Sequence, residues 1–455
     1  MADSPTFSLV LDSDSAQHVI DQAYDADESF LGPVTIHSPR PMSNTRTRAT
    51  ISSSVVSLAA TTLGAGLLSL PKAFALLGVT WGLVAVIFVG CLSDLTLSWL
   101  VDCSRLSGRR SYEGNASHYL GRYGKLTLHI FLLLLLAGAS IAMLVIAADT
   151  IPFHASELSR SSVIVLFSVL SFPLCASANL TSLKHVSALA LGCLGYFYIL
   201  LMSKFASVKT LPDDLNWTNG PSNVKDASVS VSVILSSFIC HFNIFKIDTE
   251  LADITTTRTN AVIHLSTLGI CATVYITAGL AGYFIFGGRV SSNVLDNFNH
   301  EDFGVMIGKA AICLTNLFKF PLLMVPLRDS VLEAFPEYAR NELNLFLPRI
   351  VITFILVMII SMAAINLDDL MHILGLVGCS AGMFTAFFLP AVLRMRFNHK
   401  KAEELDMINE IRRSSLLAEA GTRGPEISAS SDVMPGLIAI ASLVLGLCSF
   451  YFSIN

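Results

Sequence analysis

Charged side chains are scarce in this sequence. Asp, Glu, Lys and Arg make up 14% of its 455 residues, whereas 53% are hydrophobic and the mean hydropathy is +0.64. A soluble domain carries about 25% charged residues. The composition therefore excludes an ordinary soluble globular protein and favours a protein embedded in a lipid bilayer.

Cysteine pairs and enzyme signatures are also lacking. The nine cysteines form no Cys-x-x-Cys pair, and none lies in a segment that we expect on the non-cytosolic side. This pattern indicates neither a disulfide framework nor a zinc site. The sequence contains no Ser-His-Asp arrangement, phosphate-binding loop or metal-ligand cluster, so we expect no enzyme, no cofactor and no bound metal. Nothing indicates a nucleic-acid partner.

Long apolar runs, by contrast, recur along most of the chain. A helix needs about 20 apolar residues to cross the hydrocarbon core of a bilayer. The sequence therefore predicts an all-α polytopic membrane protein with eleven transmembrane helices. The expected spans are 51–77, 81–101, 126–148, 162–178, 185–205, 229–250, 262–286, 304–326, 347–365, 368–393 and 434–453.

The first 50 residues contain no apolar core. Their acidic composition, rich in Ser and Pro, predicts a disordered tail. No cleavable signal peptide is recognisable in it, so we expect the first span to insert by itself and to leave the tail in the cytosol. The basic residues agree with this orientation, because it puts 20 of the 29 Lys and Arg on the cytosolic side and six on the other.

This topology divides the chain into six segments. The longest loop on the non-cytosolic side contains Asn216 in "NWT", a candidate for N-glycosylation. The segments are the acidic cytosolic tail 1–50, helices one to five in 51–205, the non-cytosolic loop 206–228, helices six to ten in 229–393, the cytosolic loop 394–433 and the eleventh helix in 434–455.

Two spans carry residues that interrupt a membrane helix. The first contains "TTLGAGLLSLP" with Gly64 at its midpoint, and the sixth contains "SSFICHFNIF" centred near Ile239. The two spans run antiparallel and are five spans apart. Discontinuous helices in such corresponding positions are typical of inverted-repeat transporters, in which they meet at the middle of the bilayer.

Breaking a helix in lipid frees backbone groups that need partners. Freed amides together with the positive end of a half-helix suit a carboxylate, and freed carbonyls suit an ammonium group or a cation. An α-amino acid carries both groups on one carbon. The competing interpretation is that Gly64 and Gly66 simply allow close helix packing, as small residues often do in membrane helices.

Several motifs resemble the amino acid/auxin permease family. They are "TTLGAGLLSLPKAFALLG" on the first span, "FICHFNIFKIDTEL" on the sixth, "YFIFGGRVSSNVLDNF" after the seventh, "KFPLLMVPLRDSVLEAFP" on the eighth and "LDDLMHILGLVGCSAGMFTAFFLPAVL" on the tenth. Within this family the chain resembles the vacuolar amino-acid transporters of plants and their relatives, and also the related sodium-coupled neutral amino acid transporters of animals.

The resemblance implies a LeuT-like fold of two inverted five-helix repeats followed by an eleventh helix. It also implies alternating access of an amino acid, driven by sodium, by protons or by the gradient of the substrate itself. The substrate contacts that it implies are Thr61, Thr62, Leu63, Gly64, Ala65 and Gly66 on the first helix, and Phe238, Cys240 and His241 on the sixth.

The chain departs from its sodium-coupled relatives at the positions that hold sodium. An Asn of their first helix aligns with Ala60, and two threonines of their eighth helix align with Leu317 and Lys319. Sodium needs oxygen ligands. These side chains offer none, so the sequence disfavours sodium coupling.

Three ionisable residues are candidates for coupling or gating. Lys319 is able to replace the ion and lock the eighth helix against the first, to carry the coupled proton, or to extend to the cytosolic surface. His241 either titrates or is a neutral residue that binds backbone freed by the break. Glu250 is a candidate gate partner at the cytosolic end of the sixth helix.

The sequence therefore predicts a secondary transporter of amino acids, proton-linked or facilitative, in a vacuolar or lysosomal-type membrane, with the plasma membrane as an alternative. A competing hypothesis is a receptor that binds an amino acid and signals through the tail 1–50. A passive channel is less consistent with a site closed at mid-membrane, since channels are lined by rings of charge.

Overall fold

The computed structural model describes residues 49–150, 159–176, 184–251, 255–299, 301–333, 346–367, 369–414 and 432–454. These residues form helices, and the part of the chain that is described contains no strand beyond an isolated bridge between Ala49 and Leu251. The tail predicted for 1–50 lies outside the described residues, except for its last two.

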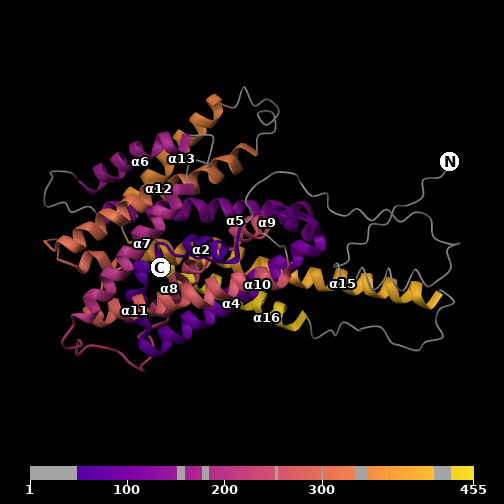
Figure 1. Cartoon of the computed structure of the whole chain (residues 1–455), viewed down its shortest axis with the longest axis horizontal. Coiled ribbons are helices and arrows are strands. Elements are labelled where there is room, and N and C mark those ends of the chain that lie inside the picture. Colours follow the sequence, from indigo (N-terminus) through magenta and orange to yellow (C-terminus); the bar gives the residue numbers. More distant parts are fainter. Residues whose placement is uncertain are drawn as a thin grey trace. The chain divides into compact units, whose positions relative to one another are not determined.

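The helices follow one another along the chain, and Figure 1 labels most of the α-helices. They are α2 (Ile51–Thr62), α3 (Gly66–Leu77), α4 (Val79–Ser107), α5 (Tyr112–Thr150), α6 (Arg160–Ala176), α7 (Lys184–Ala206), α8 (Val224–Ser237), η3 (His241–Asn243), α9 (Ile244–Glu250), α10 (Thr256–His264), η4 (Leu265–Ala272), α11 (Thr273–Phe286), η5 (Gly287–Arg289), η6 (Val294–Asn297), α12 (Phe303–Glu333), α13 (Phe346–Asn366), α14 (Leu370–Val377), η8 (Gly378–Gly382), η9 (Phe384–Phe388), α15 (Leu389–Ser414) and α16 (Val433–Ile454). Among the short elements, η3, η5 and η6 are 3₁₀ turns, whereas η4, η8 and η9 are π-helical.

Nine helices in the described ranges are long and apolar enough to cross a membrane. The pair α2 and α3 meets the same criterion together, bent by 62°, which raises the number to ten. α6 is apolar but has only 17 residues. The chain is an all-helical, multi-pass membrane protein, while the eleventh span and the inverted repeat stay predictions.

The turns between successive helices define two faces of the protein. α3 ends and α4 begins at Gly78, whose φ of 81° suits glycine, and α4 ends before Gly108 with φ 66°. Since α5 runs back across the membrane, Thr150 at its end lies on the same side as Gly78. We call these sides the Gly78 face and the Gly108 face.

Polar residues fix where several helices begin. Thr50 accepts a hydrogen bond from the amide of Ser53 at the start of α2, and Asn223 accepts one from the amide of Asp226 at the start of α8. Such caps satisfy amides that have no partner within the helix. α15 continues to Ser414, so that the helix extends well into the segment 394–433.

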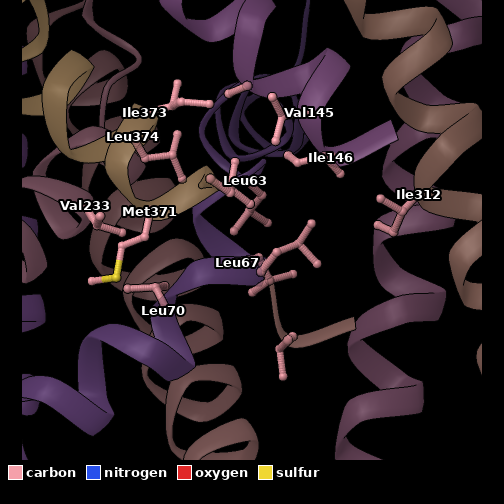
Figure 2. Close-up of a cluster of buried hydrophobic side chains, with 14 of the residues drawn as sticks. Leu63, Leu67, Leu70, Val145, Ile146, Val233, Ile312, Met371, Ile373 and Leu374 are labelled. Atoms are coloured by element: carbon pink, nitrogen blue, oxygen red, sulfur yellow. The ribbon is translucent and has the colours of Figure 1, made fainter. Parts of the chain in front are cut away.

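The packing brings the two interrupted spans together. α3 packs against α8 and α11, and α12 packs against α5 and α7. Apolar side chains fill the space between these helices: Leu63 and Leu67 lie at the centre of Figure 2, beside Val145 and Ile146 of α5. Leu63 at the first break is therefore buried among the side chains of neighbouring helices.

Candidate functional site

The first break separates α2 from α3. The helix stops at Thr62, Leu63 is extended with ψ 116°, and α3 resumes at Gly66. Within the described residues, no carbonyl accepts from the amides of Gly64, Ala65 and Gly66. These amides stand at the N-terminal, positive end of α3, where a helix favours a negatively charged group.

The carbonyls that the break frees bind the side chain of Lys319. This residue belongs to α12, and its Nζ lies 3.3 Å from the carbonyl oxygen of Ala60 and 3.0 Å from that of Leu63. In a continuous helix these two oxygens would accept from backbone amides one turn later. The ammonium of Lys319 thus connects α12 to the end of α2.

The second break lies between α8 and α9. α8 ends at Ser237, Phe238 and Cys240 depart from helical geometry, and the η3 turn leads into α9. Ser93 of α4 donates a hydrogen bond to the carbonyl of Phe238 at 3.2 Å. Like the first break, this one is held by side chains of neighbouring helices rather than by its own helix.

One hydroxyl group connects the two breaks. The Oη of Tyr275, on α11, lies 2.8 Å from the carbonyl oxygen of Thr62 and 2.7 Å from that of Ser237. Tyr275 is fully buried, and its ring packs edge-on against Phe238. The two interrupted segments therefore lie side by side around this side chain.

The glycines of the first break have different surroundings. A Cβ at Gly66 would lie 2.0 Å from Oγ of Ser237, so that glycine is required for α3 to approach α8. A Cβ at Gly64 would meet nothing closer than 4.0 Å. Close packing thus explains Gly66, whereas Gly64 borders open space beside its free amide.

His241 is buried and binds α4. Its Nε2 lies 2.9 Å from Oγ1 of Thr96, a hydroxyl that also lies within hydrogen-bond distance of the carbonyls of Leu92 and Ser93. Because a hydroxyl has one proton, this arrangement favours an imidazole that donates from Nε2. Nδ1 is buried and has no partner among the described residues.

The other predicted site residues take several roles. Thr61 and Thr62 direct their hydroxyls to the carbonyl of Leu58, so both stabilise the end of α2. Glu250 has an exposed side chain, and its carbonyl accepts from the amide of Ala49. Asn216 lies in the loop over Gly78, and its Oδ1 is buried. Its glycosylation stays a prediction.

Tyr275 and Asp94 are functional candidates that the sequence analysis missed. Tyr275 gives no signal in the sequence, because a tyrosine in an apolar helix is common. Asp94 did give one, since an acidic residue inside the run "VGCLSDLTLSWL" is costly in a bilayer. It accepts hydrogen bonds from His264 and Thr267, from the region where α10 passes into η4.

A polar cavity of about 410 Å³ opens at the Gly78 face. It is lined by Asp149, Arg160, Ser291, Ser292, Asn293, Asp296, Asp369 and Leu370. Arg160 binds Asp149 at 3.2 Å. Desolvation in this recess, and then repulsion from Asp149, raises the pKa of Asp296 to about 7, although Lys309 counteracts this rise.

Comparison with known proteins identifies the family. Residues 47–410 match the family described as transmembrane amino acid transporter protein, and this match covers most of the chain. The chain belongs to that family. The resemblance that its motifs predicted is thereby confirmed.

Individual members of the family are similar over most of their length. The chain is 29% identical over 363 residues to vacuolar amino acid transporter 5 of Schizosaccharomyces pombe, covering 77% of this chain and 85% of that protein. It is 25% identical over 393 residues to amino acid transporter AVT6B of Arabidopsis thaliana, covering 79% and 85%. It is 27% identical over 374 residues to vacuolar amino acid transporter 2 of Saccharomyces cerevisiae, covering 76% of each.

Proposed function

We propose that this protein is a secondary transporter that moves an amino acid across a membrane by alternating access, with the substrate held between the two broken helices. The observation that carries the proposal is the Tyr275 hydroxyl, which lies within hydrogen-bond distance of Thr62 and Ser237 and so brings the two breaks together. Membership of an amino acid transporter family supports the substrate class.

The backbone at the breaks matches the two charged groups of an α-amino acid. The amides of Gly64, Ala65 and Gly66 face the substrate carboxylate at the start of α3. The carbonyls around Phe238 and Cys240, where α8 has ended, face the substrate ammonium. Backbone groups recognise what all α-amino acids share, so the side chains nearby select among them. Leu63 and Leu67 give this region an apolar lining.

Sodium does not drive this transporter in our proposal. A sodium ion would need the carbonyl oxygens that Lys319 binds, at Ala60 and Leu63, and like charges in a low-dielectric site repel each other. Lys319 acts as a fixed cation that holds α12 against the end of α2 and releases it when the helices rearrange. Transport is then proton-linked or facilitative.

The vacuolar membrane is the proposed location, because the S. pombe and S. cerevisiae relatives are named as vacuolar transporters. With the N-terminus in the cytosol, the Gly108 face is cytosolic and the Gly78 face is lumenal. Two inverted repeats of five helices, with α6 as the fourth span and α16 as the eleventh, complete the proposed architecture.

The test is uptake of a panel of labelled amino acids into proteoliposomes that contain the full chain. A pH gradient or a sodium gradient is imposed across the vesicle membrane. We expect saturable uptake of at least one amino acid that does not respond to sodium. Saturable binding without flux under any gradient would overturn the transporter proposal and favour the receptor. Deletion of residues 1–45 then separates the two, because transport needs the helices and a receptor would need its tail.

A further inference from the structure

Asp94 is an acidic side chain near the middle of the 29-residue α4, and it is buried. The Nδ1 of His264 lies 2.7 Å from one carboxylate oxygen and 2.8 Å from the other. Thr267 donates its hydroxyl to Asp94 at 2.9 Å. Carboxylates at this depth are rare, paired with other groups and typical of proton pathways.

The pair of Asp94 and His264 has two protonation states that differ by one proton. With a neutral imidazole that donates from Nδ1, Asp94 and His264 together carry a charge of −1. When Nε2 takes up a proton, the imidazolium and the carboxylate neutralise each other. Imidazole is the side chain that changes charge between pH 5 and 8. The side chain of His264 is 54% exposed at the surface of the helices.

The same turn of α4 also holds the second break. Ser93, next to Asp94, donates to the carbonyl of Phe238, and Thr96, two residues further on, binds His241. On the other side, His264 is the last residue before the π-helical η4, and Thr267 lies within it. Such π-helical turns occur frequently at functional sites. A change of charge at Asp94 and His264 therefore acts on both elements that border the substrate site.

Other charged groups also lie on the helices around this pair. Further along α4 toward the Gly108 face, Arg394 of α15 binds Asp102 and Asp248 of α9 binds Arg105. Lys246 of α9, Glu250 at its end and Arg258 of α10 have exposed side chains. The titratable groups His241 of η3, Cys271 of η4 and Tyr275 of α11 are buried, and the hydrogen bonds of His241 and Tyr275 described above go to other partners.

We infer that Asp94 and His264 form the proton-binding site of this transporter, an inference that rests on the proton-linked form of the proposed function. The neutral, protonated pair moves through the transport cycle, whereas the pair with a charge of −1 resists the rearrangement because its burial costs more. The ammonium of Lys319 is bound by two carbonyls at the end of α2, so we assign this side chain a structural role and not that of the proton carrier.

The experiment compares two activities of the full chain in proteoliposomes. The first is accumulation of a labelled amino acid driven by a pH gradient, and the second is exchange of that amino acid at equal pH and equal concentration on both sides. Asp94→Asn removes the charge while retaining the shape, and His264→Gln removes the titrating ring. The matched control is Asp102→Asn. Asp102 lies on α4, as Asp94 does, but its carboxylate is bound by Arg394 of α15.

We expect Asp94→Asn, which cannot carry the negative charge, to retain exchange and to lose accumulation by at least about tenfold. His264→Gln leaves the Asp94 carboxylate with a charge of −1 and is expected to lose both activities, whereas Asp102→Asn retains both. Gradient-driven accumulation that persists in Asp94→Asn or His264→Gln would overturn the inference. So would loss of exchange in Asp94→Asn while the purified protein remains folded and monodisperse, because the carboxylate would then be needed for movement of the helices and not for the proton. If either Asp94→Asn or His264→Gln fails to fold, the accumulation measured for the other variant tests the inference.

The wild-type protein separates this inference from the function on which it rests. Exchange without any response to a pH gradient would overturn the proton site and leave amino acid transport intact. Absence of both exchange and accumulation for every amino acid in the panel would instead overturn the proposed function itself.

Discussion

The ammonium of Lys319 lies 3.0 Å from the carbonyl oxygen of Leu63, at the point where the first span is interrupted. Lys319 comes from α12, and Leu63 directly follows α2, so one contact joins two helices that are far apart in the sequence. A second carbonyl, that of Ala60, shares the same ammonium. The side chain thereby supplies the donor that the interrupted helix lacks.

Replacing Lys319 is expected to destabilise the protein. In Lys319→Met the carbonyls of Ala60 and Leu63 lose their donor in a region of low dielectric, which costs about 1–3 kcal/mol. The apparent melting temperature of the detergent-solubilised protein should fall. Lys319→Arg keeps the positive charge, so its apparent melting temperature is expected to fall less than that of Lys319→Met. Equal melting temperatures for wild type and Lys319→Met would contradict this account of the contact.

The hydroxyl of Tyr275 is expected to matter for both stability and substrate binding. Tyr275→Phe leaves the ring in place but removes the hydroxyl that lies within hydrogen-bond distance of the carbonyls of Thr62 and Ser237, at a cost of about 1–3 kcal/mol. Transport should show a raised KM, measured as concentration-dependent exchange.

The matched control for this variant is Tyr198→Phe. The hydroxyl of Tyr198 pairs with Thr277, away from the two breaks. We expect its KM to equal that of the wild type. A KM raised equally in both variants would mean that the effect is general destabilisation.

Substitutions of Gly64 and Gly66, which are separated by one residue, should give opposite results. Gly66→Ala forces a Cβ against Ser237 and is expected to destabilise the protein by about 1–3 kcal/mol. Gly64→Ala has room for its methyl group, so stability should change little while transport falls, because that methyl would occupy the space beside the free amide. Melting temperature and exchange rate are measured for both. Unaltered transport in a stable Gly64→Ala protein would argue against a substrate carboxylate at this position.

The positions of both breaks could be predicted from the sequence, but the contacts that hold them could not. Glycines and polar residues inside an apolar run mark an interruption locally, at Gly64 and again near His241. The partners of the freed backbone come from α11, α12 and α4. Tyr275 is 213 residues from Thr62, and only the packing of the helices brings them together.

The pair of Asp94 and His264 shows the same limit. An aspartate inside an apolar run can be recognised, but its partner lies 170 residues away on another helix. His264 lies at the end of a predicted span, where a histidine does not indicate a buried ionisable group. Gly66 and Gly64 look equivalent in the sequence, and only the distance to Ser237 distinguishes packing from open space.

The cavity at the Gly78 face gives a pH dependence of stability. Because the pKa of Asp296 is raised to about 7, the folded protein binds this proton more tightly than the unfolded chain does. Its contribution to stability is therefore greatest at acidic pH and is lost as the pH rises toward 7. The melting temperature of the wild type should decline over this window, and Asp296→Asn should show a shallower decline.

Asp302→Asn is the control for this pH profile. Lys204 binds Asp302 and lowers the pKa of that carboxylate, which therefore titrates below the window. Removing this carboxylate should leave the slope of the melting temperature against pH, between pH 5 and pH 7, at about the wild-type value. An identical slope in Asp296→Asn and wild type would contradict the assignment.

The most direct measurement of the central claim is protection of Cys240 from alkylation by a transported amino acid. Cys240 is buried at the second break, whereas Cys91 and Cys448 are exposed and serve as internal controls in the same molecule. Labelling of each cysteine in the full chain is followed by peptide mass spectrometry, with and without substrate. We predict that the amino acid slows labelling of Cys240 and leaves Cys91 and Cys448 unaffected. Equal labelling of Cys240 with and without a transported amino acid would contradict a substrate site between the two broken helices.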